Sequence, residues 1–227
     1  MPFINLRTRY LTMNFTANIL LVMFGTFMPL NQEYTSAKFV DPIEISYVEG
    51  VSYDEIHDEA IFNCPWAKQI TEEKEKIVSQ LISIEMEYNL PANLRGMLLA
   101  AACHESGYEV NAKGDYRKGK PMAHGLFQMW PWWEKSYKIN RKDPVQSAKA
   151  YMTHIMKMHK KVGRQCKFKS PTRRWLAAWA TAIRAPKKGG RCKETPLFYK
   201  VVKKWHKNIK ANRVENERRF NNGIDGC

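Results

Sequence analysis

Glu105 has the sequence setting that most favours acid–base chemistry. It follows residues 97–103 (MLLAAAC), an almost wholly apolar run that predicts a buried helix, and Gly107 is a natural helix stop two residues later. The end of a helix carries about half a negative charge, and burial also disfavours a charged carboxylate. Both effects raise the pKa of Glu105, and a carboxyl group still protonated near neutral pH can act as general acid in cleaving a glycosidic bond.

Two other kinds of site fit the residues less well. His104-Glu105 begins like the HExxH motif of zinc enzymes, but Tyr108 stands where the second histidine would be. No Cys-x-x-Cys pair occurs, and no local signature supports a cysteine nucleophile. We therefore expect no metal and no other cofactor.

The positive charge is concentrated in the later part of the chain. The formal charge of +15 combines a net +1 in residues 1–37, −8 in residues 38–90 and +22 in residues 91–227. A surface this basic attracts polyanions such as nucleic acid, anionic lipid or an acidic wall polymer. Several tryptophans of the basic part fall on apolar helix faces, and no nucleic-acid-binding motif is recognisable, so no specific nucleic acid is expected. A membrane-active cationic protein has support only from the mixed lysine and apolar pattern of residues 199–212.

Short motifs downstream give Glu105 a context. Glu105-Ser106-Gly107 is followed, after a polar loop, by residues 124–131 (HGLFQMWP), and later by Asp143-Pro144 at the start of an expected helix. Over roughly residues 75–210 this order resembles the soluble lytic transglycosylases of the lysozyme-like superfamily, near the goose-type lysozymes (glycoside hydrolase family 23), where ES precedes GLMQ and a proline. The resemblance implies a mainly α, lysozyme-like (transglycosylase SLT) domain with at most a small β element.

The resemblance also implies roles for individual residues. Glu105 would be the single catalytic acid and then base, and Ser106 would support the neighbouring loop and contact substrate. Gln128 would hydrogen-bond a sugar or its acetamido group, and Trp130 would stack on a sugar face. Residues 178–180 (AWA) stand where the family has Ala-Tyr-Asn, so Trp179 replaces a tyrosine and a substrate-binding asparagine is absent.

Three functions remain open at this level. The resemblance implies cleavage of peptidoglycan between N-acetylmuramic acid and N-acetylglucosamine, as a lytic transglycosylase that leaves 1,6-anhydro ends. Asp115 is the plausible second carboxylate, with which water would be the nucleophile and the protein a hydrolytic lysozyme; a turn-forming aspartate is the other interpretation. A non-catalytic cationic protein that binds the wall or nucleic acid is the third. The expected partners are peptidoglycan glycan strands and an anionic wall polymer.

Helical elements must position these residues, and prolines mark where most of them start. With 44% hydrophobic residues the chain can bury a core, and long alternating runs that would predict a large sheet are missing from the sequence. Thr71 is an expected N-cap, and further helices are expected to begin at the four prolines Pro91, Pro144, Pro171 and Pro196. The helices that start at Thr71, Pro91, Pro144 and Pro196 are expected to end near residues 90, 107, 162 and 212, respectively. Short strands are expected at most within residues 38–63, and residues 113–122 are expected to form a polar loop.

The domain organisation follows from the two ends of the chain. Residues 1–37 contain Arg7 and Arg9 before the uncharged run 19–30, which is too short to span a bilayer, and so predict a signal peptide or an N-terminal anchor. Any membrane contact would be through this segment alone. We expect an acidic lead-in over residues 38–70, the lysozyme-like domain over 71–212 and a flexible tail over 213–227. The protein is expected to be an exported monomer in the periplasm, cell envelope or extracellular medium.

The five cysteines fit an oxidising compartment. Cys166 and Cys192 lie in similar basic settings and are the preferred disulfide pair, with Cys64 and Cys103 as a second pair and Cys227 left over. Four cysteines allow three pairings, so spacing alone leaves the connectivity open.

Overall fold

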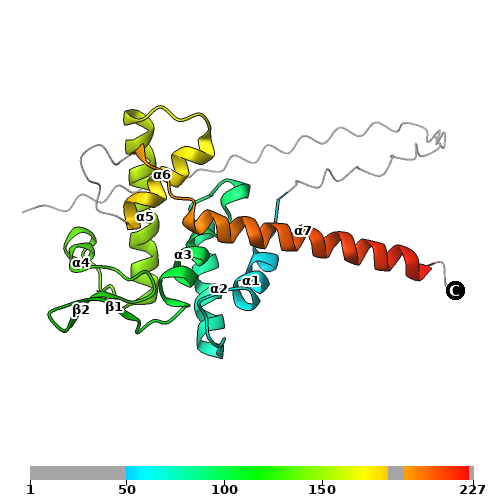
Figure 1. Cartoon of the computed structure of the whole chain (residues 1–227), viewed down its shortest axis with the longest axis horizontal. Coiled ribbons are helices and arrows are strands. Elements are labelled where there is room, and N and C mark those ends of the chain that lie inside the picture. Colours follow the sequence, from blue (N-terminus) through cyan, green and yellow to red (C-terminus); the bar gives the residue numbers. More distant parts are fainter. Residues whose placement is uncertain (1–49, 184–191, 225–227) are drawn as a thin grey trace, which may run out of the picture. The chain divides into compact units, whose positions relative to one another are not determined.

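α-Helices dominate the computed structural model, which describes residues 50–183 and 192–224 (Figure 1). The elements in chain order are α1 (Tyr53–Phe62), α2 (Glu72–Met86), the 3₁₀ turn η1 (Ala92–Leu94), α3 (Met97–Ser106), β1 (Lys113–Arg117), β2 (Lys120–His124), α4 (Pro131–Tyr137), α5 (Pro144–Gln165), α6 (Pro171–Ile183) and α7 (Leu197–Ile224). The predicted class, mainly α with a small β element, is confirmed at this level. The expected signal or anchor segment and Cys227 lie outside the described residues. Within the described ranges, no helix combines the length and the apolarity that a membrane crossing needs.

Helix α3 lies at the centre of the helical packing. Every residue from Met97 to Cys103 is fully buried, and α3 packs against α1, α2 and α7. Its three consecutive alanines leave room for close approach of these neighbours, because their side chains are small. The helix bearing Glu105 is therefore enclosed along its length, as its apolar sequence predicts.

A buried carboxylate caps the start of α3. Glu85 of α2 is fully buried, and its two oxygens accept hydrogen bonds from the backbone N–H groups of Gly96 at 2.5 Å and Leu98 at 2.6 Å. A carboxylate satisfies two unpaired N–H groups there and complements the positive end of the helix dipole. Burial nevertheless raises the pKa of Glu85 to about 7, although both backbone hydrogen bonds lower it.

The predicted helix starts are confirmed at most of the marked positions. The Thr71 side chain accepts a hydrogen bond from the Lys74 N–H, and Asp143 caps α5 with Pro144 in its first turn. Pro91 is the exception, since it opens only the turn η1. Gly96, at φ 92°, then separates this turn from α3, because a left-handed backbone cannot continue a right-handed helix.

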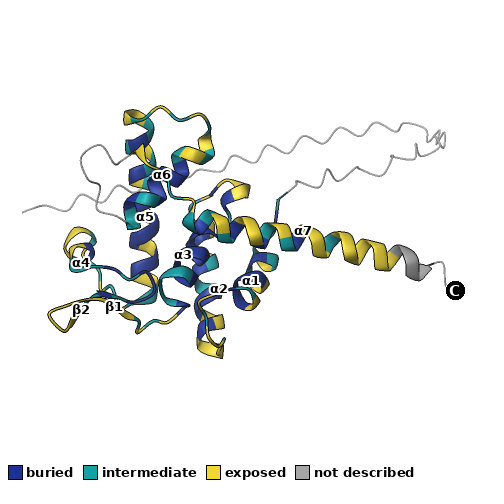
Figure 2. Ribbon diagram, viewed as in Figure 1, coloured by how far each residue is buried: buried dark blue, intermediate teal, exposed yellow. Residues whose placement is uncertain are grey.

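The helical part of the chain extends beyond both expected bounds of the domain, residues 71 and 212. Residues 53–62, in the range where short strands were expected, form α1 with a capping box between Ser52 and Glu55. Ile56 and Ala60 of α1 are fully buried in the same core as α3, so the second half of the acidic lead-in belongs to the helical body. At the other end, α7 continues through the expected tail to Ile224, and Figure 2 shows the exposed surface of its later turns.

The expected polar loop is a β-hairpin. Strands β1 and β2 pair antiparallel, with Lys113 opposite His124 and Arg117 opposite Lys120. Lys118 and Gly119 connect them, both with positive φ (50° and 75°), which is the backbone of a two-residue hairpin turn. The strands carry too few apolar residues for their alternation to be visible in the sequence.

Both expected disulfides are confirmed. Cys64–Cys103 joins the connection between α1 and α2 to the last turns of α3, with a Cα–Cα distance of 5.8 Å. Cys166–Cys192 joins the end of α5 to the segment before α7, with a Cα–Cα distance of 5.7 Å.

Candidate active site

Glu105 lies in the last turn of α3, at the edge of the core. Gly107 closes the helix in the left-handed conformation (φ 59°), and its N–H donates to the carbonyl of Cys103 at 2.8 Å. The Glu105 side chain is 21% exposed, so its carboxyl group is largely desolvated but reaches solvent. Burial, as the larger cause, and the nearby charge of Asp115 together raise the pKa of Glu105 to about 7. The predicted direction is confirmed, and near neutral pH a substantial fraction of the group is protonated.

His104 is the immediate neighbour of this acid. Its Nδ1 is 3.8 Å from the Glu105 Oε1, and this Nδ1 is buried without a hydrogen-bond partner among the described residues. Burial lowers the pKa of His104. At neutral pH the imidazole is therefore uncharged, and it does not hold Glu105 as a carboxylate by an ion pair.

The hairpin supplies a second carboxyl group. Asp115 is an exposed residue of β1 in the left-handed conformation (φ 48°), a backbone that aspartate tolerates. Its Oδ2 accepts a hydrogen bond from the Trp130 Nε1 at 2.8 Å, and the Arg117 guanidinium lies 4.5 Å from the Trp130 ring centroid. Asp115 is thus a strand residue with a fixed partner, and its charge acts on Glu105 across the site.

Gln128 lies against the same hairpin. It adopts a positive φ of 45°, and its amide Nε2 donates to the Gly125 carbonyl at 3.0 Å. A Cβ atom at Gly114 would collide with the Gln128 Oε1, so only glycine at this position leaves room for the amide. Arg141 fixes the surrounding loop by donating to the carbonyls of Met122 and Met129. The predicted residues Asp115, Gln128 and Trp130 are therefore brought together.

Two predicted site residues are placed differently. The Ser106 hydroxyl donates to the Ala102 carbonyl at 3.1 Å, one turn back in its own helix. Trp179 has no exposed surface, and its ring packs against Tyr151 and Phe198 with centroids 5.7 and 6.1 Å apart. Our assignment of Trp179 to substrate binding is corrected, because the apolar face of α6 that carries it packs into the core against α5.

Tyr151 is a residue of this site that the sequence did not reveal. It lies on α5, is 2% exposed, and stacks on Phe127 at 4.6 Å and on Trp133 at 5.7 Å. Burial raises the pKa of Tyr151 well above its ordinary value, and the Glu105 charge raises it further. The phenol therefore stays neutral within electrostatic reach of Glu105. Helical periodicity can place a residue on a buried face, but it cannot tell which side chain that face meets.

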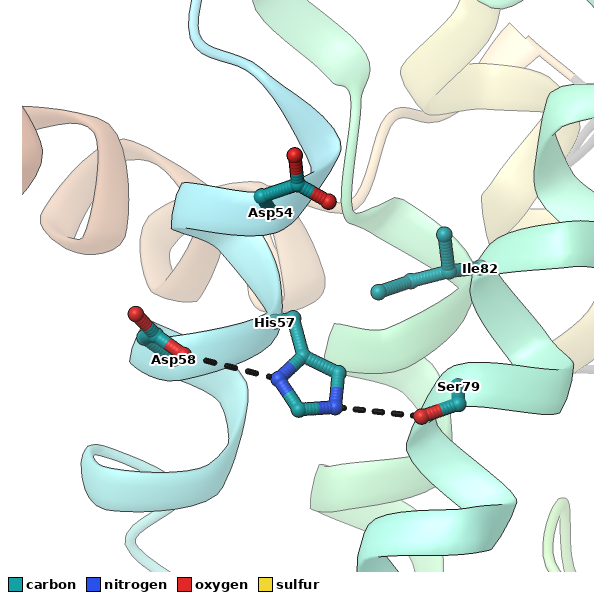
Figure 3. A pocket seen from close by; sticks show the side chains of 5 residues that line it. All are labelled: Asp54, His57, Asp58, Ser79 and Ile82. Carbon is teal, nitrogen blue, oxygen red and sulfur yellow. Dashed lines mark hydrogen bonds and ion pairs between the residues drawn. The ribbon is translucent and has the colours of Figure 1, made fainter.

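A hollow lies between α1 and α2, away from Glu105, with a volume of about 370 Å³ (Figure 3). His57 points across it, with Nε2 3.1 Å from the Ser79 Oγ and Nδ1 3.5 Å from the Asp58 Oδ1. This order of groups resembles a Ser-His-Asp system, but Ser79 lies in mid-helix and its hydroxyl is bonded to the Glu75 carbonyl. Helical N–H groups around Ser79 are used within α2, so none can stabilise an oxyanion. The arrangement lacks the parts of a nucleophilic site.

Another cavity, of about 550 Å³, is lined mainly by residues of α7 that include three lysines, and we call it the basic pocket. Its lining is Val51, Ala92, Asn93, Tyr199, Lys203, His206, Lys207 and Lys210. Its three lysines are exposed and make no ion pair with a carboxylate of the described residues. The pocket has no acid or base of the kind that Glu105 provides, and its charge suits an anion.

No family model matches the chain, no curated protein matches it, and no solved structure matches it. Within residues 50–183 and 192–224, no three His, Cys, Asp or Glu side chains gather as metal ligands.

Proposed function

We propose that the protein cleaves the glycan strands of peptidoglycan, with Glu105 as the general acid. The observation that carries this proposal is a carboxyl group with a pKa of about 7 at the solvent-reaching end of a buried helix. A second carboxylate, on Asp115, acts electrostatically on Glu105 and holds the indole of Trp130, and the amide of Gln128 lies against the same hairpin. The sequence motifs that contain Glu105 and Gln128 resemble those of the lytic transglycosylases. The mainly helical fold with one hairpin is compatible with a lysozyme-like domain.

The proposed first step is protonation of the bridging oxygen. Glu105 donates its proton to the oxygen between N-acetylmuramic acid and N-acetylglucosamine, and the C1–O bond of the muramic acid breaks. The 2-acetamido group of that sugar assists the departure. Carboxylate Glu105 then removes the proton from the C6 hydroxyl of the same sugar as its oxygen bonds to C1. The product is a 1,6-anhydro end, and Glu105 is again protonated.

Asp115 supports a second outcome at the same site. Its carboxylate is exposed and held by Trp130, and it acts electrostatically on Glu105. In this alternative, Asp115 removes a proton from a water that attacks C1, and the product has a reducing end. The two reactions share Glu105 as the acid and differ only in the nucleophile.

The decisive experiment is digestion of purified sacculi, with mass spectrometry of the soluble products. The wild-type protein should release muropeptides, and Glu105→Gln should release none while still binding the sacculi. Glu73→Gln is the matched control, because Glu73 is an exposed glutamate of α2 and should leave activity unchanged. Anhydro products are lighter by one water than hydrolysis products. Binding without release by the wild type would instead support the non-catalytic wall-binding function, and absence of both would refute the proposal.

We further propose that an anionic wall polymer occupies the basic pocket. Its three lysines along α7 span roughly 10 Å at 1.5 Å per residue, which suits an extended chain with repeated negative charges. Export follows from this target, and the two disulfides agree with it because such bonds form in oxidising compartments.

A further inference from the structure

Trp66 is a large aromatic residue that remains 43% exposed close to Glu105. It lies in the connection between α1 and α2, a region that the proposed mechanism does not use. Its ring meets the His104 ring edge-to-face, with centroids 4.5 Å apart, and His104 precedes Glu105 directly. An exposed tryptophan is thus held beside the proposed acid.

Three contacts fix this segment to the end of α3. The disulfide Cys64–Cys103 attaches the chain two residues before Trp66 to a residue two before Glu105. The Trp66 carbonyl packs so closely on Gly107 that a Cβ atom there would collide with it. The ring contact with His104 is the third. The three contacts together hold Trp66 against residues 103–107, which include Glu105. The indole therefore has a fixed position relative to the acid.

The neighbouring Phe62 is an exposed aromatic residue that lacks comparable contacts. It is 80% exposed at the end of α1 and makes no ring contact with a described residue. Trp66 differs, because three contacts restrain it while its indole still reaches solvent. A restrained aromatic surface loses little conformational entropy when it binds a flat partner.

A pyranose ring is a partner that suits this surface. The C–H bonds on one face of the sugar form an apolar plane, which packs against the flat face of an indole, while the indole edge keeps a polar N–H. Trp130 presents a second indole beside Asp115, from the hairpin side of the site. Trp66 therefore contacts His104, and Trp130 contacts Asp115, so two tryptophans from different parts of the chain lie next to neighbours of Glu105.

We propose that Trp66 forms a binding subsite for an N-acetylated amino sugar next to Glu105. This inference rests on the proposed function, since it names a contact made by the same glycan strand. Trp66 holds a sugar ring of that strand by stacking, and the Cys64–Cys103 disulfide keeps the indole in place. The role is in binding, so the loss of Trp66 should weaken affinity without altering proton transfer.

The test uses the inactive Glu105→Gln protein as parent, so that the ligand survives. The probe is a peptide-free oligosaccharide of four alternating N-acetylglucosamine and N-acetylmuramic acid units, titrated by calorimetry. Adding Trp66→Ala should weaken binding about tenfold, which corresponds to the loss of one well-packed aromatic contact. Trp66→Phe should restore part of the affinity, and Phe62→Ala should leave it unchanged.

The active enzyme supplies a second readout. Trp66→Ala should raise KM for the same oligosaccharide with little change in kcat, and the pH midpoint of activity should stay in place. A shifted pH profile with unchanged affinity would mean that Trp66 only supports His104 and Glu105, and would overturn the inference. Unchanged affinity in the parent background would also overturn it. Failure of the parent itself to bind the oligosaccharide would refute the proposed function, and with it this subsite.

Discussion

Replacing Glu105 by glutamine should make the protein more stable at neutral pH, although it removes the proposed acid. The pKa of Glu105 is about 7 in the folded chain and 4.5 for an ordinary glutamate. A carboxyl group with a raised folded pKa binds its proton more tightly when folded, so the contribution of Glu105 to the free energy of unfolding is largest below pH 4.5. That stability is lost as the pH rises from 4.5 through 7, because the charged form is disfavoured in its buried position.

The size of the effect follows from the shift. One pKa unit corresponds to about 1.4 kcal/mol, so the ionised Glu105 lowers the free energy of unfolding by about 3 kcal/mol at most. For a domain of this size that corresponds to roughly 6–12 °C in Tm. Glutamine has nearly the same shape and no charge, so Glu105→Gln should recover most of this free energy at pH 8 and almost none at pH 4.

The assay is denaturant unfolding of the wild type and Glu105→Gln at both pH values. Glu85 also has a pKa of about 7, but it is present in both proteins, so its contribution cancels in the difference. Glu73→Gln, at an exposed position of α2, is the control for the loss of one glutamate charge elsewhere on the surface. An equal difference between wild type and Glu105→Gln at pH 4 and pH 8 would contradict the reasoning, because it would mean that Glu105 ionises normally.

Three further predictions concern the surroundings of Glu105 and the basic pocket. Asp115→Asn removes a charge that raises the pKa of Glu105, so the alkaline midpoint of activity should move below 7. The midpoint should not fall as far as 4.5, because burial is the larger cause of the raised pKa. An unmoved midpoint would show that the two groups do not interact. Gly114→Ala should displace the Gln128 amide and raise KM for the oligosaccharide several-fold at unchanged Tm, whereas unaltered kinetics would exclude Gln128 from binding. Replacing the three lysines of the basic pocket by glutamine should weaken binding to sacculi that retain their anionic polymer and flatten its salt dependence, with stripped sacculi as control.

The sequence predicted the helices best where a local signal marks their start. Thr71 and Asp143 are N-caps in the structure because each side chain satisfies an N–H group that the first turn leaves unpaired. Gly163 was expected to end a helix, but α5 continues to Gln165. The Arg174 guanidinium packs directly on Gly163, so this glycine provides space for a side chain rather than a helix stop.

Tertiary contacts explain what the sequence could not predict. Glu105 was predictable because its burial follows from the apolar helix in which it lies. The contribution of Asp115 to its pKa was not, because it depends on a hairpin whose strands lack apolar alternation. Tertiary packing also explains why Trp179 was wrongly predicted as a site residue while Tyr151 was missed. Both residues lie on apolar helix faces, and only packing decides which one approaches Glu105.

The disulfide between Cys64 and Cys103 makes the assembly of this region dependent on where the protein folds. In a reducing environment the bond does not form, and the segment carrying Trp66 is left with only its packing against His104 and Gly107. Closing the bond reduces the freedom of the unfolded chain and joins the two segments permanently. A chain made in a reducing compartment would therefore complete this region only after it meets an oxidising one.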